Sequence, residues 1–405
     1  MKEFLFNHFF NVLRKLLRLF VRNKRTEILL RRVFDRSEWL YCSPRLSLDG
    51  YKCSSVSVNS HITEEDIQIC QRLITAYQKS NGYMESSEAY SEEWSDNIQA
   101  HYGLLSSALK QGDAQHLAKT LSSMFHQSFL WGIASSHLYK THWPWIRYNM
   151  LEDLMALADC LGVVSAEPDD KGVVRYPDDL DSVVAKIKSA IGIDIGFPPV
   201  GSPYGIKSGD VLITPESPEH IYVALRVDDV IKRHLNSSPS FRPRIMEIGA
   251  GYGGLAFWLL TIRKLNVDSY FIIDLPIVNV LQGYFLSKVF GAGCVSFNQE
   301  KCSEKTTFQV LPTYAVRQCQ DIDILVNENS MPEMPEHAVK EYLLYAKDNV
   351  RGIFYSYNQE LNSQLNNIPQ VLVPKVVSEV GGFDRISRNC SWVRHGYVEE
   401  IYVRQ

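Results

Sequence analysis

One short segment, RIMEIGAGYGG at residues 244–254, constrains the fold of this chain more than any other. Its first six residues predict a strand, and GGLAFWLLTIRKL, which overlaps its end, has the pattern of a helix. Gly249, Gly251 and Gly253 let the backbone between them turn sharply and approach a ligand with no Cβ in the way. A strand, a glycine-rich turn and a helix in this order predict an α/β domain with a ligand at the turn.

Strand and helix patterns alternate from this segment to the C-terminus. The predicted strands are SYFIID, GCVSFN, DIDILVNE and RGIFYSYN, the predicted helices are PIVNVLQGYFLSKVF and PEHAVKEYLLYAKDN, and the tail SWVRHGYVEEIYVRQ alternates like an antiparallel edge strand. Such alternation indicates a mostly parallel sheet with helices on both faces. We therefore expect a Rossmann-like α/β domain over residues 237–405, with its ligand at the carboxyl ends of the strands.

The part of the chain before this domain is predicted to be mainly helical. A chain of 405 residues is too long for one ordinary core, so two domains are expected. Apolar residues recur at helical spacing over residues 37–195, which we take as the N-terminal domain. Five prolines and four glycines within residues 195–220 exclude a long helix there. Residues 196–236 are expected to be a connecting segment or lid that ends in a helix opening at Ser217.

The first 36 residues form a segment of a different kind. Over residues 4–25, phenylalanines and leucines share one helical face, and Arg14, Lys15, Arg18 and Arg22 share the other. This basic amphipathic helix either packs on the protein or makes peripheral contact with the inner face of an anionic membrane.

Composition narrows the cellular setting and the partners. None of the eight cysteines forms a C-x-x-C pair, which indicates a reducing compartment and therefore the cytoplasm, and excludes a zinc finger. A net charge of −4 gives no general attraction to nucleic acid, so no nucleic-acid partner is expected. The sequence leaves the oligomeric state open, a homo-oligomer included.

Two acidic side chains beside the glycine turn bear on its ligand. Gly249, Gly251 and Gly254 satisfy the dinucleotide pattern G-x-G-x-x-G, but the same turn also fits S-adenosylmethionine. A carboxylate repels the pyrophosphate of a dinucleotide and attracts the sulfonium and ammonium groups of S-adenosylmethionine. Glu247, two residues before the first glycine, therefore favours S-adenosylmethionine. Asp274, at the end of the next predicted strand, suits the ribose hydroxyls of either ligand.

Several strings resemble a family of sugar O-methyltransferases that occurs in bacterial gene sets for surface polysaccharide. They are EIGAGYGGLA, IIDLP, IFYSYNQE and ILVNENSMPEM, the last with an N-x-x-S-x-x-E-M pattern at Asn327, Ser330, Glu333 and Met334. The resemblance covers about residues 195–405 and implies a class I methyltransferase domain. That domain has a mostly parallel seven-stranded sheet with an antiparallel C-terminal strand. The implied activity is methyl transfer from S-adenosylmethionine to a sugar hydroxyl of a surface polysaccharide or its precursor.

The resemblance implies that the residues that bind the methyl donor lie at or just after the ends of the predicted strands. Asn298 follows the third predicted strand and is expected beside the adenine. The full expected set is Glu247, Gly249, Ala250, Gly251, Tyr252, Gly253, Asp274, Leu275, Asn298 and Asn327.

The acceptor hydroxyl is a poor acid, so a general base is expected beyond the fourth and fifth strands. The candidates are Glu333, Glu328 and His395, while His337 is expected to be a solvated surface histidine. Residues expected to bind the sugar are Tyr204, Ser330 and Asn358. Magnesium could be held by Glu328, Asn329 and Glu333, although nothing in their spacing requires a metal.

Two alternatives remain open at the level of sequence. One is methyl transfer to a small phenolic or nitrogen acceptor, although phenolic O-methyltransferases usually carry a histidine after the fourth strand, where this chain has none before His337. The other is a non-catalytic partner in glycan assembly that binds S-adenosylmethionine.

Overall fold

The structure is a computed structural model of the chain. It describes residues 53–55, 62–80, 92–134, 143–164, 167–168, 174–175, 179–360, 364–365 and 368–405. The basic segment predicted over residues 1–36 lies outside these described residues. Within the described part of the chain, no helix has both the length and the hydropathy that crossing a membrane requires.

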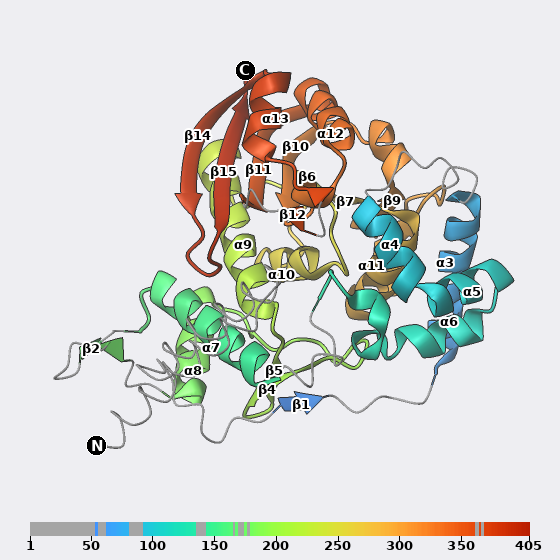
Figure 1. The fold of residues 1–405 in the computed structure, drawn as a ribbon, viewed down its shortest axis with the longest axis horizontal. Coiled ribbons are helices and arrows are strands. Elements are labelled where there is room, and N and C mark those ends of the chain that lie inside the picture. Colours follow the sequence, from blue (N-terminus) through green and yellow to red (C-terminus); the bar gives the residue numbers. More distant parts are fainter. Residues whose placement is uncertain are drawn as a thin grey trace, which may run out of the picture.

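A single large sheet organises the C-terminal part of the chain (Figure 1). Its strand order is β14-β15-β11-β10-β6-β7-β9-β8, and β15 runs in the opposite direction to the other seven strands of this sheet. The strands are β6 Arg244–Ile248, β7 Ser269–Asp274, β8 Val295–Phe297, β9 Phe308–Pro312, β10 Ile322–Glu328, β11 Val350–Gln359, β14 Phe383–Cys390 and β15 Tyr397–Arg404. The predicted α/β class and Rossmann-like sheet are confirmed, but this sheet has eight strands where seven were expected.

Helices cover both faces of this sheet, as the alternating pattern predicted (Figure 1). Ile245 and Ile272 point into a core shared with α9 Ser217–Val230, α10 Gly254–Ile262 and α11 Pro276–Phe290. Their neighbours Met246 and Ile273 point into a second core under α12 Glu336–Asn349 and α13 Val373–Val380. Because successive side chains of a strand face opposite ways, both faces of the strands are apolar and buried.

The helices before residue 195 join the first of these cores. They are α3 Glu64–Ser80, α4 Glu92–His101, α5 Gly103–Gln111, α6 Ala114–Leu121, α7 Trp143–Cys160 and α8 Leu180–Ile191. Helix α3 packs against α11 and α7 packs against α9. Arg72 of α3 also forms a two-bond ion pair with Glu300, with N–O distances of 3.0 and 2.7 Å. The N-terminal part is helical, as expected, and it shares one apolar core with the sheet.

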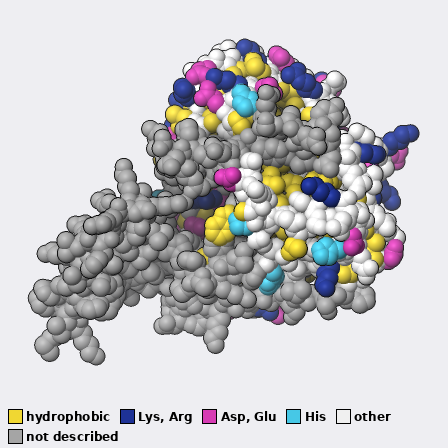
Figure 2. All heavy atoms as spheres, turned by 45° about the vertical axis from the view of Figure 1, so that its right-hand side comes forward, with side chains coloured by type: hydrophobic (Ala, Val, Ile, Leu, Met, Phe, Trp, Pro, Cys, Tyr) yellow, Lys and Arg dark blue, Asp and Glu magenta, His cyan; other side chains and the backbone are white. Residues whose placement is uncertain are grey.

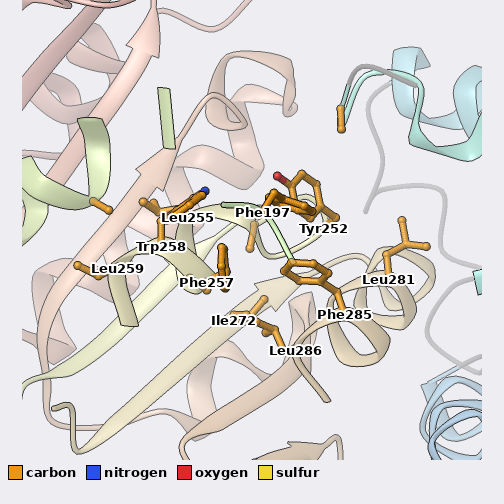
Figure 3. Close-up of a cluster of buried hydrophobic side chains, with 14 of the residues drawn as sticks. Phe197, Tyr252, Leu255, Phe257, Trp258, Leu259, Ile272, Leu281, Phe285 and Leu286 are labelled. Atoms are coloured by element: carbon orange, nitrogen blue, oxygen red, sulfur yellow. The ribbon is translucent and has the colours of Figure 1, made fainter. Parts of the chain in front are cut away.

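The Pro/Gly-rich segment forms part of the interior. It contains β4 Tyr204–Ser208 and β5 Val211–Ile213, which pair with each other, and β1 Cys53–Ser55 pairs with β4. Phe197 packs beneath the glycine turn, with its ring centroid 6.0 Å from that of Tyr252 and 5.6 Å from that of Phe285 (Figure 3). None of residues 196–215, all of which the structure describes, lines the main cavity. Many of them are buried, whereas Lys207, Gly209 and Asp210 are exposed, and the lid role stays a prediction.

Short elements complete the described chain. They are the 3-10 helices Met124–His126, Ser128–Leu130, Ala292–Cys294, Thr313–Gln318 and Met331–Glu333, the π-helix Ile231–Leu235, and the strand pairs β2 Glu167–Pro168 with β3 Val174–Arg175 and β12 Gln364–Leu365 with β13 Ile368–Pro369. Figure 2 shows one face of the molecule, where acidic and basic side chains are interspersed over the described part.

Candidate active site

The main cavity lies at the carboxyl ends of β6, β7 and β10, where an α/β sheet of this order is expected to bind its ligand. Its walls come from distant parts of the chain, because Trp94 of α4 and Ile133 line it together with the glycine turn. The loop after β10 and the first turns of α12 close the opposite side. Both the helical region and the sheet therefore contribute to the site.

The glycine turn has the backbone that its sequence predicted. Gly249, Gly251 and Gly253 have φ angles of 73°, 57° and 94°, a region that favours glycine. The Gly249 amide donates to the carbonyl of Ile273, at 2.9 Å, which ties the turn to β7. A Cβ at Gly249 would lie 2.1 Å from Ser330 Oγ, so the loop after β10 packs directly on the turn.

Glu247 and Asp274 lie at this turn, and both line the cavity. Tyr270 donates its hydroxyl hydrogen to Glu247 Oε2 at 2.7 Å, and burial raises the pKa of Glu247 to about 8. Asp274 accepts from the Leu275 amide at 2.7 Å and from Gln282 Nε2 at 2.6 Å, and burial raises its pKa to about 7. Each carboxyl is thus held in place by the chain while its ionised form is disfavoured.

Glu328, at the end of β10, also lines the cavity. Its Oε1 atom is buried and has no hydrogen-bond partner among the described residues. Burial raises the pKa of Glu328 well above its usual range, and Glu219 and Glu247 raise it further. A buried acceptor without a partner is costly unless a ligand supplies the missing donor.

His220 is a cavity residue that sequence reasoning missed. It lies in the first turn of α9, with Nε2 3.8 Å from Glu328 Oε2 and Nδ1 3.4 Å from the Tyr252 hydroxyl. Burial lowers the pKa of His220 to about 4. The only trace of this contact in the sequence is the glycine at position 254, because a Cβ there would lie 2.4 Å from the His220 ring. That glycine shows that something packs closely on the turn, but not which residue does so.

The end of β10 and the loop after it contain several residues predicted for the site. Some of them line the cavity, and one supports the cavity wall from behind. Asn327 is fully buried and donates from Nδ2 to the Ile248 carbonyl at 2.8 Å and to Ser330 Oγ at 2.6 Å, so it supports the wall from behind. Ser330 and Glu333 line the cavity, and Glu333 Oε2 accepts from Trp94 Nε1 at 3.2 Å. Asn329 also lines it, with a φ of 62° and a buried Oδ1 that has no partner in the described structure.

Other predicted site residues lie elsewhere in the described structure. Asn298 donates to Ser80 Oγ at 3.2 Å and to the Tyr314 hydroxyl at 2.8 Å, because β9 lies between β8 and β7 and moves the end of β8 away. Asn358 donates to Ser356 Oγ at 2.9 Å within β11. Tyr204 is buried in β4, and His395 is exposed in the turn between β14 and β15. None of these four lines the cavity, so the structure does not bring them together with the other predicted site residues, and the roles expected for them stay predictions.

Five further residues that the sequence singled out have clear positions. Ala250, Tyr252 and Leu275 line the cavity, whereas Gly253 caps the start of α10 behind it. His337 is exposed on α12, as expected of a surface histidine.

Apart from His220, the ionisable groups of Asp, Glu, Lys and Arg on the cavity wall are all acidic. Among the described residues that line it, four are carboxylic acids and none is lysine or arginine; the acids are Glu247, Asp274, Glu328 and Glu333. Within the same described part of the chain, no cluster of three or more His, Cys, Asp or Glu side chains has an arrangement that could hold a metal ion. When ionised, the carboxyl groups of this wall would attract a cation.

No protein-family model and no curated protein matches this chain. Solved structures similar to it include magnesium protoporphyrin IX methyltransferase from Synechocystis PCC 6803 with bound SAM, at 10% identity, 46% coverage of this chain, 81% of that chain and a TM-score of 0.33. The PH0226 protein from Pyrococcus horikoshii OT3 has 10% identity, coverages of 46% and 92%, and a TM-score of 0.33. Precorrin-6y C5,15-methyltransferase from Geobacter metallireducens GS-15 has 11% identity, coverages of 48% and 90%, and a TM-score of 0.29. Similarities this distant do not identify a function.

Proposed function

We propose that this chain is an S-adenosylmethionine-dependent O-methyltransferase that methylates a sugar hydroxyl of a surface polysaccharide or its precursor. The observation that carries the proposal is the acidic wall of the cavity, with four carboxylic acids and no lysine or arginine among its described residues. Carboxyl groups of this wall that ionise beside a ligand would attract its sulfonium and ammonium groups and repel a pyrophosphate, which argues against a dinucleotide.

The residues at the glycine turn fit this methyl donor. Gly249 and Gly251 allow the ligand to approach the backbone, Glu247 offers a carboxylate to its positive charges, and Asp274 offers oxygens to its ribose. When bound, the donor supplies a methyl group that its sulfonium has already activated. The protein then has to align the acceptor hydroxyl and accept its proton.

The opposite side of the cavity supports a sugar as the acceptor. Glu328 Oε1 and Asn329 Oδ1 are buried acceptors without partners in the described structure, and hydroxyl groups would satisfy them. Trp94 adds an aromatic side chain beside the carboxyl group of Glu333, so a polar ring could contact an apolar surface and hydrogen-bond in one place. The resemblance at Asn327, Ser330, Glu333 and Met334 points to the same acceptor class.

Calorimetry on the full chain tests the donor. S-adenosylhomocysteine is expected to bind and NADH to give no heat. Tight NADH binding without binding of S-adenosylhomocysteine would overturn the proposal at its first step.

Transfer from methyl-labelled S-adenosylmethionine tests the acceptor. The probes are UDP-glucose, UDP-galactose, dTDP-rhamnose and purified bacterial surface polysaccharide, compared with catechol and histamine. Label in the sugars or glycan supports the proposal. Label only in catechol or histamine would assign a small-molecule acceptor, and binding without any transfer would indicate a non-catalytic protein.

A further inference from the structure

We propose that His220 is the general base of this site and that its Nε2 atom accepts the proton of the acceptor hydroxyl. This inference rests on the proposed function and assigns a catalytic residue within it. His220 belongs to α9, which precedes the glycine turn in the chain, and it lines the same cavity as Glu247 and Glu328.

The His220 ring is held in one place by the turn. Gly254 leaves room for it, since a Cβ there would lie 2.4 Å from Cε1 and 2.6 Å from Nδ1. Tyr252 packs against its side, with ring centroids 5.8 Å apart and planes at 69°. The tautomer with hydrogen on Nδ1 donates to the Tyr252 hydroxyl oxygen at 3.4 Å and leaves the Nε2 lone pair on the side of Glu328. A base must be held rigidly in this way to meet a hydroxyl at hydrogen-bond distance.

The groups around His220 are acidic, apart from Arg394, whose positive charge contributes to lowering the pKa of His220. Glu328 Oε2 lies 3.8 Å from Nε2, and Glu219 directly precedes His220 in α9. Glu219 is itself held by Arg394, at 2.7 Å, and by Asn329, at 3.2 Å. An imidazolium formed here would have a carboxyl group at its side, whereas a histidine in a purely apolar site would not.

The protonation states of the two neighbours favour the histidine as the acceptor of the proton. Burial lowers the pKa of His220 to about 4, so its imidazole is neutral at neutral pH. Burial raises the pKa of Glu328 well above its usual range, which favours its protonated form over the ionised form that could accept a proton.

The net charge inside the cavity does not change during methyl transfer if the base is neutral before the reaction. The acceptor oxygen bonds to the methyl carbon, the electron pair of the carbon–sulfur bond stays on sulfur, and the hydroxyl proton moves to His220 Nε2. One positive charge thus disappears from sulfur as one appears on the imidazole, so the net charge of the cavity stays the same. A site of low polarity disfavours the creation or loss of net charge, so this arrangement suits a buried reaction. The proton then leaves to solvent, which restores the neutral imidazole.

Two substitutions at His220 test this role in the full chain, with His234→Gln as the matched control because His234 is exposed further along the same helical segment. His220→Gln is expected to bind S-adenosylhomocysteine in calorimetry within about threefold of the unaltered protein. Its rate of label transfer to the sugar acceptor methylated by the unaltered protein should fall by about 10² to 10⁴-fold, the usual contribution of a general base. His220→Ala leaves space for added imidazole, which should restore part of the rate in proportion to its neutral form. His234→Gln should change neither quantity.

The outcomes separate this role from the alternatives. A His220→Gln protein that keeps its transfer rate within threefold overturns the proposal. So does one whose loss appears as weaker S-adenosylhomocysteine binding, because His220 would then hold the donor. If the unaltered protein binds S-adenosylhomocysteine but methylates none of the sugars, the proposed function fails and this inference falls with it.

Discussion

Glu247 illustrates at the scale of one residue how a site can be prepared for a cation. Its carboxyl group is buried, Tyr270 donates to it at 2.7 Å, and burial raises its pKa to about 8. In the ligand-free protein at neutral pH the group is therefore mostly protonated. A positive charge nearby favours the ionised form, so the bound donor and the ionised carboxylate stabilise each other.

Glu247→Gln is expected to weaken S-adenosylmethionine binding by about tenfold or more, because it removes a buried carboxylate that would face a positive charge. S-adenosylhomocysteine, which lacks the sulfonium charge, should lose less affinity. Calorimetry with both compounds measures the difference. Equal losses for the two would show that Glu247 does not respond to the sulfonium.

The same carboxyl group predicts how affinity depends on pH. Binding that requires ionised Glu247 releases a proton below pH 8, so S-adenosylmethionine affinity should rise by up to about tenfold per unit between pH 6 and 8 and then level off. The free energy of unfolding of the ligand-free protein changes with pH in the opposite direction, and falls as pH rises. A carboxyl pKa raised on folding contributes stability that is present below the unfolded value and is lost as pH rises through about 8. Titration calorimetry and thermal melts across this range check both, and both slopes should weaken in Glu247→Gln.

At the scale of elements, the site depends on contact between the glycine turn and the loop after β10. Gly249→Ala places a Cβ 2.1 Å from Ser330 Oγ at a φ of 73°, so it should destabilise the protein by about 1 to 3 kcal/mol and abolish donor binding. Gly293→Ala is the matched control, because a Cβ there would meet nothing within 4 Å. Thermal melts and calorimetry compare the two. Normal donor binding by Gly249→Ala would mean that the turn is not the donor site.

The elements also show where sequence reasoning succeeded and where it stopped. The strand, turn and helix around Gly249 were predictable because their periodicity and glycine spacing are local. Strand β9 was missed, and its place between β7 and β8 moves the end of β8, with Asn298, away from the cavity. Strand β14 was missed because its residues are mostly exposed, so no apolar alternation marks it.

The candidate site was predictable only where its residues belong to the sheet. Glu247, Asp274 and Glu328 stand at strand ends, and parallel strands bring such ends together. His220 and Trp94 reach the cavity by helix packing, which no pattern in one sequence specifies. Asn327 was assigned to the donor because it stands at a strand end, but its side chain points behind the wall.

At the scale of the whole molecule, the helical region and the sheet share one core. Leu73 of α3 is buried against α11, where a Cβ on Gly283 would lie 2.6 Å from its Cδ2 atom. The cavity is lined from both regions, by Trp94 and Ile133 on one side and by strand ends on the other. A core that crosses the expected domain boundary at residue 195 should unfold as one unit.

Leu73→Ala tests this continuity, because Leu73 lies about 200 residues before the sheet strand β7 that its core includes. Deleting its buried methyl groups should lower the free energy of unfolding by about 2 to 5 kcal/mol, and the whole shared core should become less stable. Hydrogen exchange is therefore expected to speed up together in peptides from α3 and from β6 with α10, and denaturant should produce a single transition at lower concentration. Leu104→Ala is the control, since Leu104 is 61% exposed on α5. Faster exchange confined to the helices before residue 195, with β6 unaffected, would instead show two domains that unfold separately, and the helical wall of the cavity could then open without loss of the sheet.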